Sequence, residues 1–167
     1  MTEAQHEQDL EAIRHLIARQ FASVTWTEER EADWSAFGAD FLADAPLFPA
    51  SRPVEARSVP NFLTRMKALP SEGLTSFEQS LCGTKIMLFG NIAVAFGVCE
   101  NLENRSTAQR EIEAFLLVKD GSVWRITGLI VVSSNRLDGP ALALHASKEE
   151  TIHGGLRNSV PRPIAET

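Results

Sequence analysis

Carboxylate side chains on segments of alternating polar and apolar residues are the groups of this sequence best suited to proton transfer. Glu111 and Glu113 lie two positions apart on one such segment, and Glu100 and Lys85 lie on two others. In an apolar cavity, desolvation raises the pKa of a carboxyl group and makes it a usable proton donor or base. In the alternative interpretation, the glutamates lie in water near strand ends or pair with Lys85 and Arg110.

Metal ligands and nucleophiles are not arranged in a recognised pattern. The four histidines lie towards the two ends of the sequence: His6, His15, His145 and His153. Their spacing matches neither HxH nor HExxH, and Cys82 and Cys99 form no CxxC pair. The sequence also contains no glycine-rich phosphate loop. We therefore expect no metal and no cofactor.

The composition is typical of a soluble protein of one domain. The chain has 167 residues, of which 44% are hydrophobic and 23% charged, and its formal net charge is −6. Because no basic stripe accompanies this charge, we expect no nucleic-acid partner and no membrane partner. The sequence shows neither a signal peptide nor the about 20 apolar residues of a membrane span. These features predict a cytoplasmic protein with reduced cysteines.

Three helices are predicted in the first 70 residues. Apolar residues recur at helical spacing over residues 3–24. Thr27 is the expected cap of a second, shorter helix whose apolar side includes Phe37 and Phe41. Three prolines within residues 45–57 exclude helix there and reduce any strand to an edge piece. Ser58 is then the expected cap of a third helix, which ends at Pro70.

Four long strands follow the helices. Period-two alternation covers residues 75–89, 92–102, 109–118 and 123–134. Gly90-Asn91 predicts a two-residue hairpin loop, and residues 119–121 predict a three-residue loop. Beyond this domain, residues 1–137, the C-terminal extension 138–167 is expected to hold a short helix and then a loose tail.

Three stretches resemble the nuclear transport factor 2-like superfamily, which includes SnoaL-like cyclases and ketosteroid isomerases. They are FGADFLADAPLFPASRP, FGNIAVAFGVCEN and FLLVKDGSVWRITGL. The resemblance implies an α+β fold, in which a cone-shaped, strongly curved antiparallel sheet wraps around three N-terminal helices. It implies no single function, because this fold hosts enzymes, binding proteins and assembly domains.

The resemblance also bears on individual residues. Ketosteroid isomerases use a tyrosine and an aspartate to hold an oxyanion and a second aspartate as base. This sequence has no tyrosine, Pro49 stands near the base position, and Glu113 stands at the oxyanion aspartate position. We therefore expect a small-molecule-binding protein, a lyase or isomerase if it is an enzyme, with Glu113 or Glu100 as the acid/base group. The alternative is a non-catalytic dimerisation or scaffold domain.

A pocket in the cone would be lined mainly by aromatic and aliphatic side chains. The expected pocket residues are Trp26, Phe37, Phe41, Phe62, Met66, Lys85, Phe96, Phe115 and Leu129. Arg52 and Arg57 on the proline-rich loop are candidate ligand contacts at the mouth. The expected ligand is a small apolar or carbonyl-bearing organic molecule, and these two arginines would also suit an acid.

Hairpin register decides which residues share a face. The Gly90-Asn91 loop would place Cys82 opposite Cys99, close enough for a cross-link under oxidation. A three-residue loop at 119–121 would pair Leu116 with Trp124 on the face opposite Glu113, whereas a two-residue loop would bring Trp124 to the face of Glu113. Because both faces of the sheet are largely apolar, we expect a homodimer that covers the second face.

Overall fold

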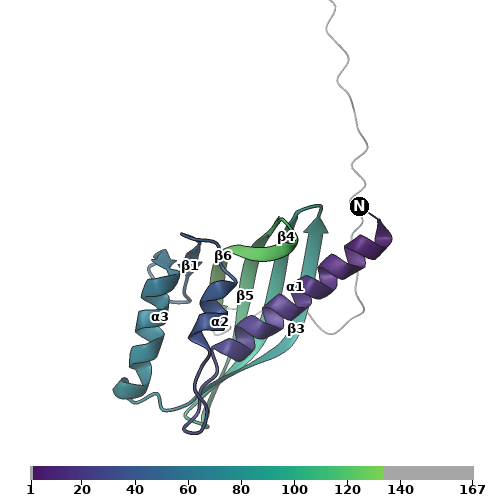
Figure 1. Ribbon diagram of the computed structural model, residues 1–167. Helices are drawn as coiled ribbons and strands as arrows, with labels where there is room; N and C mark the ends of the chain where they lie inside the picture. Colours follow the sequence, from purple (N-terminus) through teal and green to yellow (C-terminus); the bar gives the residue numbers. More distant parts are fainter. Residues whose placement is uncertain (1, 134–167) are drawn as a thin grey trace, which may run out of the picture.

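A long helix lies across one face of a curved sheet, and two shorter helices lie beside it (Figure 1). The computed structural model describes residues 2–133, so the predicted extension, residues 138–167, lies outside the described part. The helices are α1 (Glu3–Ser23), α2 (Trp34–Ala39), α3 (Val59–Ala68) and the 3₁₀ helix η1 (Leu69–Glu72). Within residues 2–133, none of the helices has the length and apolar character needed to cross a membrane.

Six strands form one open sheet in the order β2-β1-β6-β5-β4-β3. They are β1 (Pro46–Phe48), β2 (Arg57–Ser58), β3 (Phe77–Phe89), β4 (Ile92–Glu103), β5 (Thr107–Asp120) and β6 (Val123–Ser133). The predicted α+β fold, with a curved sheet around N-terminal helices, is confirmed. One strand departs from the antiparallel pattern, because β1 pairs with β6 in parallel, Leu47 opposite Leu129.

The helix caps show where sequence reasoning held and where it failed. Ser58 caps α3 as predicted, its hydroxyl accepting a hydrogen bond from the Asn61 backbone N–H at 3.3 Å. Thr27 does not cap the second helix; its hydroxyl accepts from the Glu29 N–H within a local turn. Asp33 caps α2 instead and accepts from the Ala36 N–H at 2.9 Å. A carboxylate is an equally good cap, and here it lies directly before the helical residues.

The β3–β4 hairpin has the predicted loop but not the predicted cysteine pair. Phe89 lies opposite Ile92, as a two-residue loop at Gly90-Asn91 requires. A β-bulge at Cys82 then shifts the register, so that Leu81 lies opposite Cys99. Cys82 is exposed and Cys99 is fully buried, and the expected pairing of the two is therefore wrong.

The β5–β6 hairpin uses a two-residue turn, Gly121-Ser122, rather than the predicted three-residue loop. The cross-strand partner of Trp124 is therefore Lys119 and not the predicted Leu116. Trp124 is buried beneath α1, where its indole Nε1 donates to Asp9 Oδ1 at 3.0 Å. Lys119 Nζ lies 2.7 Å from the same oxygen. Trp124 is thus a core residue that fastens the hairpin to α1.

The inner face of β4, under α1, carries small residues. Ala93, Ala95 and Cys99 are each at most 1% exposed, and Gly97 lies between them. A Cβ atom at Gly97 would come within 2.8 Å of the Phe21 ring of α1. The bulky residues of the hairpin, such as Phe89 and Ile92, lie on the outer face. The small inner face is therefore what allows α1 to lie close to the sheet.

Replacing Gly97 by Ala should destabilise the fold by about 1–3 kcal/mol, because the added methyl group would displace the buried Phe21 ring. Urea denaturation would measure the loss. Gly83→Ala is the matched control, because a Cβ there meets nothing within 4 Å, and its stability should be equal to the wild type or slightly higher. Equal stability of the two variants would contradict the close approach.

Candidate active site

A cavity of about 230 Å³ lies beyond the end of α1, between the helices and the inner face of the sheet. Much of its wall is apolar and includes Phe37, Phe62, Met66, Phe77, Leu129 and Val131. Its polar wall consists of Gln20, Gln79, Asn101, Glu103, Glu111 and Glu113. Five amide or carboxyl side chains from β3, β4 and β5 thus line a cavity whose remaining wall is mostly hydrophobic.

Glu113 is the most buried acid of this wall, with 8% of its surface exposed. Burial and the neighbouring Glu111 raise its pKa to about 8, and the hydrogen bond from Gln79 Nε2 to Glu113 Oε1, 3.0 Å long, offsets only part of this effect. The only partner of the carboxyl group among the described residues is thus a neutral amide. Glu113 is therefore mostly protonated at neutral pH and can exchange a proton near physiological conditions.

Glu111 and Cys99 complete a buried cluster with Glu113. Burial raises the pKa of Glu111, to which Asn101 Nδ2 donates at 2.7 Å, and the nearby Glu103 adds to the rise. Burial also raises the pKa of the Cys99 thiol, and the nearby Glu113 and Glu111 raise it further. The ligand atoms of Cys99, Glu111 and Glu113 lie within 4.8 Å of one another, a spacing that suits one divalent cation.

In this structure the two acids of the cluster are each hydrogen-bonded to a neutral amide. A metal binds the thiolate form of cysteine, whereas burial keeps Cys99 as a thiol. Hydrogen bonds from Gln79 and Asn101 already occupy one oxygen of each carboxyl group. A cluster of this kind is chemically capable of proton transfer.

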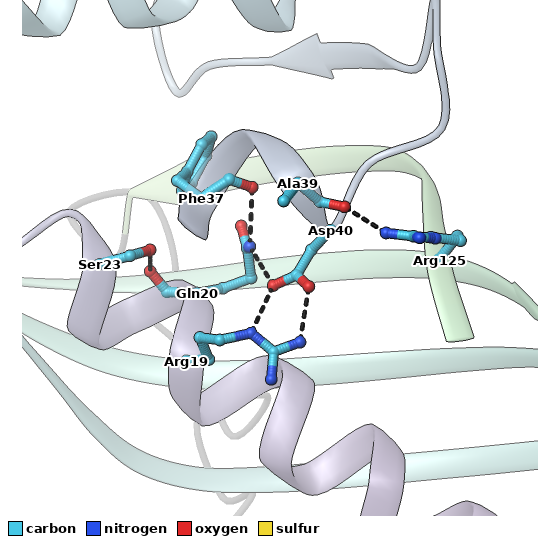
Figure 2. Close-up of polar contacts among 7 residues, drawn as sticks. All are labelled: Arg19, Gln20, Ser23, Phe37, Ala39, Asp40 and Arg125. Carbon is cyan, nitrogen blue, oxygen red and sulfur yellow. Dashed lines mark hydrogen bonds and ion pairs between the residues drawn. The ribbon is translucent and has the colours of Figure 1, made fainter. Parts of the chain in front are cut away.

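Gln20, near the end of α1, is held in one orientation by contacts with α2 (Figure 2). Its Nε2 donates to the Phe37 carbonyl oxygen at 3.1 Å and to Asp40 Oδ2 at 2.8 Å. Arg19 fixes that carboxylate by donating to both of its oxygens, at 2.5 and 3.0 Å. These two hydrogen bonds use both amide hydrogens of Gln20. No described residue donates a hydrogen bond to its Oε1 atom.

The structure brings five of the predicted site residues to the cavity and places six elsewhere. Those that line it are Phe37, Phe62, Met66, Leu129 and Glu113. Trp26, Phe41 and Phe115 belong to the hydrophobic core and do not line it.

Lys85, Phe96 and Glu100 lie on the outer face of the sheet, which corrects their assignment to the pocket. Lys85 lies opposite Phe96, and both point away from α1, since Ala95 and Gly97 point towards it. Glu100 is exposed and accepts hydrogen bonds from Arg110 at 2.6 and 2.8 Å. The alternative interpretation of solvated, paired charges therefore holds for Glu100.

Four polar residues of the cavity were missed by sequence reasoning: Gln20, Gln79, Asn101 and Glu103. Gln79 lies two positions after the buried Phe77, and Asn101 two positions after the buried Cys99, so each shares the inner face of its strand. Polar residues at inner positions were the available signal. Arg52, in contrast, does not line the cavity, and its guanidinium donates to backbone oxygens of its own loop, at 2.9 Å to Ser51.

Comparison with known proteins identifies the fold. No protein-family model and no curated protein matches the sequence. Several solved structures do match, at low sequence identity. A nuclear transport factor 2-like protein of unknown function from Pseudomonas putida has a TM-score of 0.60 and 16% identity, over 79% of this chain and 88% of that chain. A protein of unknown function with a cystatin-like fold from Nostoc punctiforme has a TM-score of 0.59 and 15% identity, over 75% and 91%.

An enzyme is also among the matching structures. A hexachlorocyclohexane dehydrochlorinase from Novosphingobium barchaimii has a TM-score of 0.62 and 11% identity, over 79% of this chain and 90% of that chain. At such identities the likeness concerns the fold alone. The chain has the nuclear transport factor 2-like fold, as the sequence resemblance implied.

Stability should depend on pH through Glu113. Between the ordinary pKa of 4.5 and the folded value of about 8, the folded state keeps a proton that the unfolded state has lost, so stability falls as pH rises through this window. Glu113→Gln should remove that dependence and become the more stable protein above pH 8, by on the order of 4 kcal/mol. Urea denaturation at pH 5, 7 and 9 would measure the difference.

Glu100→Gln is the matched control, because this glutamate lies in water beside Arg110. Its stability should follow the wild-type pH dependence. A Glu113→Gln curve parallel to the wild type would show that the buried carboxyl group titrates normally.

Proposed function

We propose that the protein binds a small, largely apolar organic molecule in the cavity and transforms it by acid/base chemistry, with Glu113 as the proton-transferring group. The observation that carries this proposal is a protonatable carboxyl group in the wall of an apolar cavity. The fold shared with a hexachlorocyclohexane dehydrochlorinase supports it, because that enzyme's name describes an elimination. The reaction class is accordingly that of a lyase or isomerase.

The two protonation states of Glu113 suit the two halves of such a reaction. The neutral acid donates a proton to a leaving group or to a carbonyl oxygen of the ligand. The ionised form, desolvated by the apolar wall, removes a proton from carbon. In an elimination the leaving group departs from the adjacent carbon, and in an isomerisation the same proton returns to a different carbon. Gln79 positions the carboxyl group in both states.

A general probe of a buried base is 5-nitrobenzisoxazole, whose ring opens when a base removes its C3 proton and the N–O bond breaks, giving a coloured cyanophenolate. The wild type should accelerate this reaction, with a rate that rises with pH through about 8 as Glu113 ionises. Glu113→Gln should lower the enzymatic rate by about 100-fold or more. Absorbance of the phenolate would follow the rate.

Two controls make this test specific. Glu100→Gln on the outer face should keep the wild-type rate, and EDTA should leave the rate unchanged if no bound metal takes part. A rate that Glu113→Gln does not lower would remove this residue from the mechanism. Native mass spectrometry of the purified protein would independently seek a copurified small molecule.

A second proposal concerns the outer face of the sheet, which we infer to be a homodimer interface. Five large apolar side chains on this face are between 48% and 54% exposed: Phe89, Ile92, Leu116, Val123 and Ile130. Exposed apolar side chains gathered on one sheet face favour burial against a second copy. A non-catalytic dimerisation domain would use the same surface and would need no cavity, so this observation also favours that alternative role.

Leu116→Lys should dissociate the dimer, because the substitution places a charge in the middle of the apolar face. Sedimentation velocity at micromolar concentration should give a dimer for the wild type and a monomer for the variant. Val54→Lys is the matched control: Val54 is 57% exposed on the proline-rich loop, and this variant should remain dimeric. A monomeric wild type would contradict the proposed interface.

A further inference from the structure

The charged side chains that line the cavity are all acidic. Glu103, Glu111 and Glu113 provide carboxyl groups, and no Lys, Arg or His lines the cavity within residues 2–133. Arg52, a candidate from the sequence, donates hydrogen bonds to its own loop instead. A carboxylate ligand would therefore find no cation to pair with, whereas an ammonium ion would lie beside groups that can carry the opposite charge.

Two buried acceptors in the same wall have no donor among the described residues. They are Asn101 Oδ1, on a residue 4% exposed, and Gln20 Oε1, on a residue 2% exposed. Their identity as oxygens follows from their neighbours: the Asn101 amide nitrogen faces Glu111, and the Gln20 amide nitrogen faces Asp40. Turning either amide round would place its oxygen against a carboxyl oxygen. Both residues line the cavity, but each of these oxygens has almost no exposed surface, so a ligand donor would reach it only after a turn of the side chain.

We infer that the ligand of this cavity is a small organic ammonium ion, an apolar body that carries a positively charged primary amine. This inference rests on the proposed function, because it names the ligand class of the same site. An ammonium group has three N–H donors for the carboxyl oxygens of Glu111 and Glu113, which lie within 4.8 Å of each other in the cavity wall. A neutral alcohol supplies one donor and leaves the negative charge uncompensated.

The rest of the wall suits the apolar part of such a cation. The rings of Phe37 and Phe62 stack with their centroids 5.5 Å apart, and Phe77 lines the same cavity. Aromatic faces attract cations and pack against hydrocarbon. The volume of about 230 Å³ is below the roughly 300–1,000 Å³ typical of pockets for drug-sized ligands. The body of the ligand is therefore one ring or a short chain.

Three probes with one ring and different polar groups test the inference: benzylamine, benzyl alcohol and benzoate. Isothermal titration calorimetry at pH 7 on the full chain should give benzylamine an affinity at least about tenfold higher than benzyl alcohol, since its hydrogen bonds and charge meet carboxylates. Benzoate should give no detectable binding. Methyl NMR signals of Met66, Leu129 and Val131 should shift on binding, which reports occupancy of the cavity.

Glu111→Gln distinguishes charge recognition from ring binding. The variant retains an oxygen for the Asn101 amide and removes one negative charge. Benzylamine affinity should fall by at least about tenfold, and benzyl alcohol affinity should change less than about threefold. Glu100→Gln, which removes a charge from the outer face, should leave both affinities at the wild-type value.

The outcomes separate this inference from the proposed function. Benzyl alcohol binding as tightly as benzylamine, or benzoate binding in the cavity, would overturn the ammonium assignment and leave the cavity as a ligand site. Benzylamine binding that Glu111→Gln does not weaken would also overturn it. If none of the probes shifts the cavity methyl signals, both this inference and the proposed ligand-binding function fail.

Discussion

The close contact between α1 and β4 determines where everything else in the fold can lie. Phe21 packs directly over Gly97, and its ring meets Phe115 edge to face, with centroids 6.1 Å apart. Because the inner side chains of β4 are small up to Cys99, the helix fills the space that bulky side chains would otherwise occupy. The cavity opens only beyond that point. On β4 its first lining residue after Cys99 is Asn101, and on the helix side it is lined from Gln20 onward, near the end of α1. The position of the candidate site is thus a consequence of how far α1 extends.

The buried carboxyl groups divide into two kinds according to their partners. Asp9 receives hydrogen bonds from Lys119 and Trp124, and these lower its pKa below the usual range although burial alone would raise it. Asp40 is held by the two-pronged contact from Arg19. Both acids fasten α1 to its surroundings. Glu113 has only the neutral Gln79 amide, so burial dominates and the proton stays. The same chemical group is a structural anchor where a cation faces it, and it holds its proton in the cavity wall where none does.

Sequence reasoning succeeded where local chemistry decides the structure. The amphipathic stripe of α1, the Ser58 cap and the Gly90-Asn91 loop each depend on a few neighbouring residues. It failed where packing decides. Lys85, Phe96 and Glu100 were expected in the pocket, but they lie on the outer face of the sheet with bulky residues such as Phe89 and Ile92. The close approach of α1 requires that the β4 face with small side chains points inward. Glu113 was expected at the site because it stands at the oxyanion aspartate position that the resemblance implies, and the structure places it in the cavity wall.

A single extra residue in β6 shows how turn and bulge together build the cavity wall. The two-residue turn places Trp124 and Ile126 on the inner face. Strict alternation would also place Gly128 and Ile130 on the inner face, although Ile130 is exposed. The bulge opposite Leu116 and Leu117 inserts Thr127, whose hydroxyl donates to the Leu116 carbonyl at 3.0 Å.

That insertion reverses the parity of the remaining strand. Leu129 and Val131 turn inward to line the cavity, with Leu129 opposite Phe115, and Ile130 turns to the outer face. Parallel pairing with β1 begins at the same point, Leu47 opposite Leu129, which brings the proline-rich loop to the cavity through Pro49. Because a bulge leaves no period-two signature of its own, sequence alternation alone assigns one end of this strand wrongly. The hairpin can therefore supply a core tryptophan at one end and an apolar wall for the acid cluster at the other.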